Sequence, residues 1–412
     1  MSDVRPFRAL RPRTDLAARV AAPPYDVINS EEARQMAEGN EISFLHINKP
    51  EIDLPREVDI YDDRVYATGA RNLRRFMAAG VFVREKEPRF YVYQQRMGGH
   101  VQAGMVVAAS CQEYADGLIK RHEFTRKDKE DDRTRHTHEL NANAGPVFLT
   151  YRKRPDIDTI VAGIRKGSPT YDFIAPDGIA HTVWVVPAEQ AERIRAAVGQ
   201  VPALYVADGH HRAASAARVG LERKAANASH RGDEPYNYFL AVLFPHDQLR
   251  ILDYNRVVKD FGGLSEEDFL KKVGEKFTVA PASEPRPDSP RRFGMFLGGK
   301  WHRLEAKPGT FPANDPVRSL DAAILQENLL APVLGIADVR TDKRIDFVGG
   351  IRGLGELERR VNEGWAAAFA LFPTSLDQLM SVADAGLVMP PKSTWFEPKL
   401  RSGLLVRTLD TW

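Results

Sequence analysis

The sequence predicts an α/β protein whose sheet is mixed, with parallel and antiparallel strands. Between residues 147 and 219, short apolar runs typical of strands alternate with helical segments, as in open α/β sheets. Two earlier apolar runs, 89–95 and 100–108, flank Met97-Gly98-Gly99, and this pattern predicts an antiparallel hairpin. The length of 412 residues suits two or three domains and a sizeable core.

The composition is that of a soluble globular protein, with 43% hydrophobic and 28% charged residues. The net charge of +2 does not favour a nucleic-acid partner. The single cysteine, Cys111, excludes an intramolecular disulfide, and its apolar neighbours favour a core thiol. The sequence has no apolar run long enough for a membrane span and no signal-peptide pattern at its N-terminus, so we expect a cytoplasmic protein without a membrane partner.

Local patterns divide the chain further. An amphipathic helix is predicted over 60–80, and the alternating run 43–47 predicts a strand. Prolines at 281, 285, 287 and 290 predict a linker over 280–291. We therefore expect an α/β core over 1–279 and a smaller α+β domain over 292–412.

The turn after the predicted strand 203–207 is the most promising place for chemistry. Asp208-Gly209 ends the strand, and His210-His211-Arg212 opens an alanine-rich helix. The first N–H groups of a helix have no partner within it and attract anions, and Arg212 adds a forked cation suited to phosphate. The alternative is a well-capped helix with two surface histidines.

A second candidate is the charged segment 120–139. Its carboxylates Glu123, Asp131 and Asp132 are candidate metal ligands or bases, and its cations Arg121, Lys129, Arg133 and Arg135 are candidate phosphate clamps. The alternative is a solvated helix face with pairs such as Lys127–Asp131 and Asp131–Arg135. Zinc is not favoured, because His122, His136 and His138 lack the spacing of a zinc-protease helix.

Three further places carry polar groups in rigid surroundings. Tyr25-Asp26 follows two prolines, and Arg256 lies in a charged stretch where it could bind an anion or form a local ion pair. Lys392 and Ser393 belong to a proline-rich tail that could close over a site, or simply pack through its aromatic residues. We take Tyr25, Asp26, Arg256, Lys392 and Ser393 as candidate substrate-binding residues.

The DGHHR turn with its small-residue helix resembles the signature box of the ParB/sulfiredoxin-like fold, and especially that of its free serine kinases. Other blocks resemble the bacterial and archaeal "domain of unknown function 1015" family. They are RPFRALRP (5–12), APPYDV (22–27), SFLHINKPEIDLP (43–55), HEFTRKDKEDDRTRH (122–136), DYNRVV (253–258) and STWFEPKLRSGLL (393–405). The resemblance implies a nucleotide-binding core with added N- and C-terminal elements.

The resemblance to free serine kinases implies a phosphotransferase that moves a phosphoryl group from ATP or ADP to an amino-acid hydroxyl, with L-serine giving O-phosphoserine. Phosphoryl transfer needs charge neutralisation, a metal and a group that orients the hydroxyl. Glu123, Asp208 and His210 are the predicted catalytic residues, and Asp208 and Asp132 the predicted Mg²⁺ ligands. The predicted nucleotide-binding residues are Gly209, His210, His211, Arg212, Arg121 and Arg133.

A second interpretation is a ParB-like nucleotide-binding module that regulates or binds a partner without kinase activity. A sulfiredoxin-like activity is not expected, because the phosphate turn contains no cysteine. A homodimer is left open.

Overall fold

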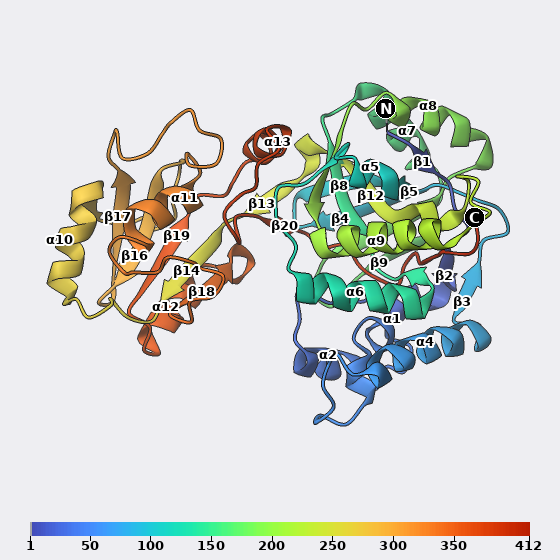
Figure 1. The fold of residues 1–412 in the computed structure, drawn as a ribbon, viewed down its shortest axis with the longest axis horizontal. Helices are drawn as coiled ribbons and strands as arrows, with labels where there is room; N and C mark the ends of the chain where they lie inside the picture. The colour runs from blue at the N-terminus through green and yellow to red at the C-terminus, as the bar shows by residue number, and fades with distance from the viewer. Residues whose placement is uncertain (1) are drawn as a thin grey trace. The chain divides into compact units, whose positions relative to one another are not determined.

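The chain crosses twice between two units in the computed structural model, which describes residues 2–412 (Figure 1). The first unit comprises the chain up to Leu249 together with Pro398–Trp412, and the second is Arg250–Glu397. This division differs from the predicted boundary at 280–291. Pro281 ends one strand of the second unit, and the other three prolines lie in the connection to the next strand. Proline marks such a loop as readily as a linker between domains.

A mixed sheet forms the centre of the first unit and confirms the α/β class. In spatial order its strands are β6 (Ile119–Lys120), β11 (Leu204–Asp208), β8 (Val147–Tyr151), β12 (Tyr238–Pro245), β5 (His100–Ser110), β4 (Tyr91–Met97), β10 (Ala180–Val185) and β9 (Tyr171–Ile174), with β1 (Val4–Arg5) beside β5. β11 runs parallel to β6 and β12 parallel to β8, while the other pairs are antiparallel. The hairpin predicted from 89–108 is β4 and β5.

Helices cover one face of this sheet. They are α5 (Cys111–Ala115), α7 (Pro155–Ile164), α8 (Ala191–Gly199) and α9 (His210–Ala226). In α9 the alanines 213, 214, 216 and 217 are buried against strand residues such as Leu149 and Val206, because a small side chain lets the helix approach the sheet closely. Cys111 is buried in the same core, as predicted. α6 (Lys127–Leu140) lies along α9 (Figure 1).

The last residues of the chain return to the first unit, and we call Pro398–Trp412 the C-terminal strap. Its strand β21 (Arg407–Thr408) pairs with β7 (Ala142–Asn143), and Ser402 exchanges backbone hydrogen bonds with Ala22. Leu404 and Leu405 lie beside Tyr93 and Val242 of the sheet. The strap therefore ties the N-terminal segment to the sheet.

The N-terminal segment has a core of its own, in which Phe44, Phe76 and Phe82 meet. Its elements are β2 (Leu10–Pro12), α1 (Ala17–Val20), α2 (Ser30–Ala37), α3 (Leu45–Asn48), α4 (Asp63–Ala78) and β3 (Phe82–Arg84). α4 confirms the helix predicted over 60–80. The strand predicted over 43–47 is wrong: α3 occupies it and buries Leu45 and Ile47 together, and so short an apolar run does not distinguish a buried helical turn from a strand.

The second unit is built on an antiparallel sheet with the order β15 (Phe277–Pro281), β17 (Lys300–Ala306), β16 (Arg292–Leu297), β19 (Ala367–Leu371), β14 (Tyr254–Val258) and β18 (Ile345–Gly349). Its helices are α10 (Glu266–Lys276), α11 (Asp321–Leu325), α12 (Leu354–Asn362) and α13 (Leu376–Asp384), and β13 (Arg250–Leu252) pairs with β20 (Trp395–Glu397). Short 3₁₀ turns lie at Thr14–Leu16, Pro50–Asp53, Ala188–Gln190, Pro235–Asn237, His246–Gln248 and Gly350–Arg352, and a π-helical turn at Gln326–Leu330.

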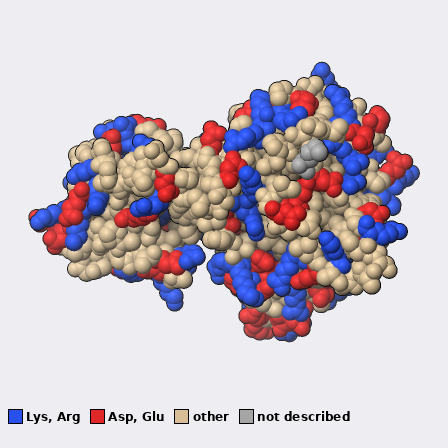
Figure 2. Space-filling model, turned by 45° about the horizontal axis from the view of Figure 1, so that its top comes forward, with Lys and Arg blue, Asp and Glu red and all other residues tan. Residues whose placement is uncertain are grey.

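The surface charges are mixed in sign. On the face shown in Figure 2, lysine and arginine side chains are interspersed with aspartate and glutamate on each unit. This face has no broad basic area of the kind that a nucleic-acid backbone selects. Within residues 2–412, no helix has both the length and the apolar composition needed to cross a membrane.

Candidate functional site

The site lies at one edge of the first unit's sheet, where two parallel strands end. β6 and β11 pair in parallel, so the loop after β6 (121–126) and the turn after β11 leave the sheet at the same edge. The first brings His122 and Glu123, and the second brings Asp208, Gly209 and His210. This juxtaposition joins the two segments that the sequence singled out separately.

The turn itself depends on Gly209. Its φ of +87° lies in the left-handed region, and a Cβ atom there would stand 2.9 Å from Nε of Arg212. α9 starts at the next residue, and its first intrahelical backbone bond joins the Ala213 amide to the Gly209 carbonyl. By helix geometry the amides of His210, His211 and Arg212 have no acceptor within α9, and their role as an anion site stays a prediction.

Arg212 is buried beneath the turn and braces it. Its Nη1 donates to the Pro146 carbonyl at 2.5 Å, and its Nη2 lies 3.5 Å from Asp208 Oδ2 and 3.7 Å from Asp26 Oδ2. Within residues 2–412, its Nε has no hydrogen-bond partner. Two of the three guanidinium nitrogens of Arg212 therefore contact the protein, and the residue positions the turn. Its Nε is the donor that remains for an anion.

Asp208 stays ionised because cations surround it. Lys399 Nζ, from the C-terminal strap, lies 3.5 Å from Asp208 Oδ2, the same oxygen that faces Arg212. Burial raises the pKa of Asp208, but Lys399, Arg212 and His210 outweigh burial and lower this pKa to about 2. Lys399 belongs to the block 393–405 but is not among the residues predicted from this part of the chain, which are Lys392 and Ser393.

His122, Glu123 and His210 form a compact cluster. The two imidazole rings are perpendicular with centroids 4.5 Å apart, and His210 Nδ1 lies 3.9 Å from Glu123 Oε2. Burial lowers the pKa of His210 to about 4, against the opposing effect of Asp208 and with smaller contributions from His211, Arg121 and Arg212 in the same direction as burial. Burial also lowers the pKa of His122 well below its ordinary value. Both rings are therefore neutral at pH 7, while the Glu123 side chain is 39% exposed.

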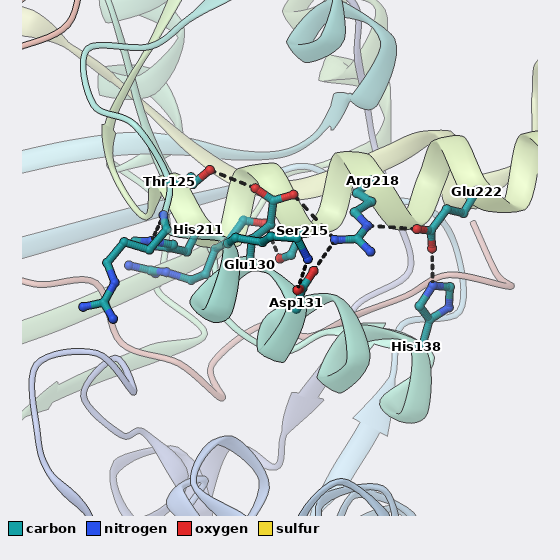
Figure 3. A network of polar contacts seen from close by, with 11 residues as sticks. Thr125, Glu130, Asp131, His138, His211, Ser215, Arg218 and Glu222 are labelled. Carbon is teal, nitrogen blue, oxygen red and sulfur yellow. Dashed lines mark hydrogen bonds and ion pairs between the residues drawn. The ribbon is translucent and has the colours of Figure 1, made fainter. Parts of the chain in front are cut away.

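His211 connects the turn to the charged segment. Its Nε2 accepts a hydrogen bond from the Arg126 amide at 3.0 Å, and a network of side chains continues from there between α6 and α9 (Figure 3). Arg218 of α9 is its centre: Nη1 bonds Asp131 at 2.6 Å and Nε bonds Glu222 at 2.9 Å. The network holds α6 against α9 and thereby fixes the end of the loop that carries Glu123.

The charged segment therefore has a structural role over most of its length. The predicted pair Lys127–Asp131 is confirmed at 2.7 Å. The predicted pair Asp131–Arg135 is wrong, because Asp131 turns to Arg218 and Arg135 pairs with Asp63 of α4 at 2.6 Å. Both charges found partners on neighbouring helices, which local spacing does not reveal.

Asp132 and Arg133 lie deeper in the same unit and neutralise each other. The Asp132 carboxylate accepts from Tyr66 Oη at 2.9 Å and pairs with Arg133 at 2.8 Å. The Arg133 guanidinium stacks on Tyr25 with 4.1 Å between its Cζ and the ring centroid. Each Asp132 oxygen therefore has a protein partner, its role as a Mg²⁺ ligand beside Asp208 stays a prediction, and Arg133 holds the Tyr25-Asp26 turn in place.

The remaining predicted residues are distributed between the units. Arg121 is exposed and stacks on Tyr114 at 4.9 Å, close enough to His210 to affect its titration. Arg256, Lys392 and Ser393 belong to the second unit. There Arg256 donates to the carbonyls of Tyr254 and Pro391, and Ser393 donates to the Pro390 carbonyl at 2.6 Å. Their contact with a substrate stays a prediction.

The fold and the site define a mixed α/β protein with a polar cluster at the carboxyl ends of two parallel strands. The chain belongs to the DUF1015 family, described as proteins of unknown function, whose model matches residues 4–323. No curated protein matches the chain.

Solved structures with a similar fold include a free serine kinase in complex with AMP, at 12% identity and a TM-score of 0.36, covering 71% of this chain and 86% of that chain. A conserved hypothetical protein from Pyrococcus furiosus is 12% identical with a TM-score of 0.37, covering 75% of this chain and 97% of that one. A C-terminally truncated SbnI from Staphylococcus aureus is 12% identical with a TM-score of 0.41, covering 74% and 87%. The ParB-like assignment of the core stays a prediction.

Proposed function

We propose that the chain is a small-molecule kinase that transfers a phosphoryl group from ATP or ADP to the hydroxyl of a free amino acid, with L-serine as the first candidate. One observation carries the proposal: a half-exposed carboxylate, Glu123, stands 3.9 Å from His210, the first residue of the helix whose amides form the anion site. Phosphoryl transfer requires this pairing of phosphate-binding donors with a group that positions the attacking hydroxyl.

The phosphate end of the site consists mainly of backbone. The amides of His210, His211 and Arg212 supply oriented donors, and the helix dipole favours the negative charge that they bind. The exposed Arg121 is the side chain most suited to an outer phosphate oxygen, because Arg212 and Arg133 are largely committed to protein partners. These donors are fixed before the reaction, so little reorganisation is needed as charge shifts in the transition state.

Glu123 acts on the acceptor. As an ionised carboxylate it accepts the hydroxyl proton of the amino acid while the hydroxyl oxygen forms a bond to the transferred phosphorus. The bond between that phosphorus and the bridging oxygen of the donor breaks, leaving ADP from ATP or AMP from ADP. The neutral His210 ring, buried beside Glu123, helps to hold the carboxylate in place.

Mg²⁺ would be held chiefly by the phosphates of the nucleotide, as is usual for this ion. Asp208 is the protein carboxylate that suits it: both cation contacts of Asp208 use Oδ2, so Oδ1 is the oxygen to offer. When bound, the ion neutralises phosphate charge.

The test is nucleotide consumption with Mg²⁺ and either ATP or ADP, measured against a panel of free amino acids and small polyols. We expect turnover that depends on L-serine and yields O-phosphoserine. Glu123→Gln should lower kcat by at least a hundredfold and leave nucleotide affinity nearly unchanged, because it removes only the proton acceptor. Asp208→Asn should weaken Mg²⁺-nucleotide binding.

The matched control is Glu192→Gln, which changes an exposed glutamate of α8 and should leave both quantities as in the wild type. Saturable nucleotide binding without turnover for any acceptor would replace the kinase by a regulatory nucleotide-binding module. Normal turnover in Glu123→Gln would refute the role of Glu123 as base.

A further inference from the structure

The cluster of His122, Glu123 and His210 has the composition of a transition-metal site. Each side chain offers one ligand atom, and the three atoms all lie within 4.8 Å of one another. Two of the residues are adjacent in the β6–α6 loop, whereas the third opens α9, so the parallel pairing of β6 and β11 assembles the set. Two imidazoles and a carboxylate on one face of an ion are a ligand set that divalent transition metals accept.

Both histidine rings are buried and are carried by fixed elements of the first unit: His122 directly follows β6, and His210 opens α9. The His122 ring hydrogen-bonds to the backbone of Val206, and such a bond fixes the orientation of a ligand ring. The nitrogen of His210 that faces Glu123 is Nδ1, 3.9 Å from Glu123 Oε2, so the ring offers this nitrogen to an ion that the carboxylate also binds.

We propose that His122, Glu123 and His210 together bind one divalent transition-metal ion, with Zn²⁺ as its representative and one coordination position left open to solvent. This goes beyond the proposed kinase function and does not depend on it, since no nucleotide takes part. The two imidazole ligands separate the site from Mg²⁺ and Ca²⁺ sites, because those ions prefer oxygen ligands alone.

The geometry needs one adjustment. Zn–ligand bonds of about 2.1 Å place tetrahedral ligand atoms about 3.4 Å apart, which is closer than the present 4.8 Å limit. The buried rings are held by their surroundings, whereas the Glu123 side chain is 39% exposed and can swing toward them. Around the ligands, Arg121, Arg212 and His211 oppose a cation and Asp208 favours one. Glu123 therefore contributes the decisive negative charge.

A metal ion on Glu123 would occupy the oxygen that the kinase proposal assigns to the hydroxyl proton. The ion and the base function then exclude each other, and Zn²⁺ should inhibit any transfer that depends on Glu123.

The experiment is a calorimetric titration of the full-length, metal-stripped protein with Zn²⁺ alone, followed by visible absorption with Co²⁺. We expect one ion per chain and the absorption bands of four-coordinate Co²⁺. Glu123→Gln and His210→Gln should each weaken Zn²⁺ binding at least tenfold, whereas His138→Gln, which changes a half-exposed histidine of α6, should leave it unchanged. Excess Mg²⁺ should not displace Zn²⁺.

The proposal is overturned if the wild type binds no stoichiometric Zn²⁺, if Glu123→Gln keeps wild-type affinity, or if Mg²⁺ competes at equal concentration. Circular dichroism identifies a His210→Gln protein that fails to fold, and in that case the half-exposed Glu123 decides the outcome alone. Nucleotide binding is measured separately without Zn²⁺, so failure of the kinase proposal leaves the Zn²⁺ isotherm intact, and the reverse also holds.

Discussion

Arg212 of the first unit and Arg256 of the second unit are both buried, but their guanidinium groups differ in their hydrogen bonds. At the sheet edge of the first unit, the His210 Nε2 and Arg212 Nε atoms are buried without a hydrogen-bond partner among residues 2–412. In the second unit, the buried Arg256 donates to the carbonyls of Tyr254 and Pro391 and lies under the ring of Phe347. Because most buried polar atoms in folded proteins are hydrogen-bonded, Arg212 keeps a donor available to a ligand, whereas Arg256 donates to carbonyls of its own unit.

The histidines are also distributed unevenly between the two units. Of the eleven in the chain, His302 is the only one in the second unit. The comparison of Arg212 with Arg256 shows which observation is the better guide to function. For an arginine or lysine in a family-like block, the state of its hydrogen bonds is more informative than its presence in the block.

The largest expected effect comes from Gly209→Ala, which places a Cβ atom 2.9 Å from Arg212 Nε at a φ of +87°. We expect nucleotide affinity to fall more than tenfold and the free energy of unfolding to fall by about 1–3 kcal/mol. Calorimetry with nucleotide and urea unfolding measure the two changes. Gly178→Ala is the matched control, since Gly178 has a φ of +79° and a Cβ atom added there would meet nothing within 4 Å. Equal loss of nucleotide affinity in Gly209→Ala and Gly178→Ala would show that the turn at Gly209 has no specific role in nucleotide binding.

The second unit supplies the contrasting test. Arg256→Met leaves the carbonyls of Tyr254 and Pro391 without their donor and should lower the free energy of unfolding by about 3 kcal/mol. Nucleotide affinity of the folded variant should stay within twofold of the wild type. Ser393→Ala removes one hydrogen bond, to Pro390, and should cost about 1 kcal/mol. If instead Arg256→Met is as stable as the wild type but raises the KM for the amino acid, Arg256 is a substrate ligand and the comparison fails.

A pH dependence of stability is expected to originate in the first unit. Burial lowers the pKa of His136 and of His181 to about 3, and positive neighbours, Arg133 and Arg401 respectively, add to this. As the pH falls below about 6.5, the unfolded chain binds protons that the folded chain refuses until about pH 3, so stability is lost with acidification. Each histidine should lower the free energy of unfolding by about 2 kcal/mol between pH 7 and pH 5.

Urea unfolding at pH 7, 6 and 5 measures this slope. His136→Gln and His181→Gln should each make the slope shallower, whereas His302→Gln should leave it unchanged. An unchanged slope in both first-unit variants would show that His136 and His181 do not cause the pH dependence of stability.

Local patterns predicted the parts of the fold that local sequence determines. The hairpin β4–β5, the helix α4 and the transition from β11 through Asp208-Gly209 to α9 all follow from apolar periodicity, glycine and alanine content. α3 was missed because four residues are too few to show a period.

The domain division and the composition of the site depend on contacts between distant segments. The second unit is inserted between Leu249 and Pro398, and no local signal marks an insertion of that kind. His122 was judged with its neighbours His136 and His138, whereas its actual partner is His210, which the pairing of β6 with β11 brings near. Lys399 reaches Asp208 only because the strap returns to the first unit.

The return of the C-terminal strap to the first unit has a consequence for the order of events during biosynthesis. The last strand of the nine-stranded sheet ends at Pro245, so a nascent chain of that length already contains the sheet, the turn and both histidines of the cluster. It lacks the lysine that faces Asp208, which is translated only after the whole inserted unit. Since domains fold as they emerge, the sheet of the first unit would form before Lys399 is available to pair with Asp208. Products terminated within the second unit would therefore lack the Lys399 cation that faces Asp208 in the candidate site.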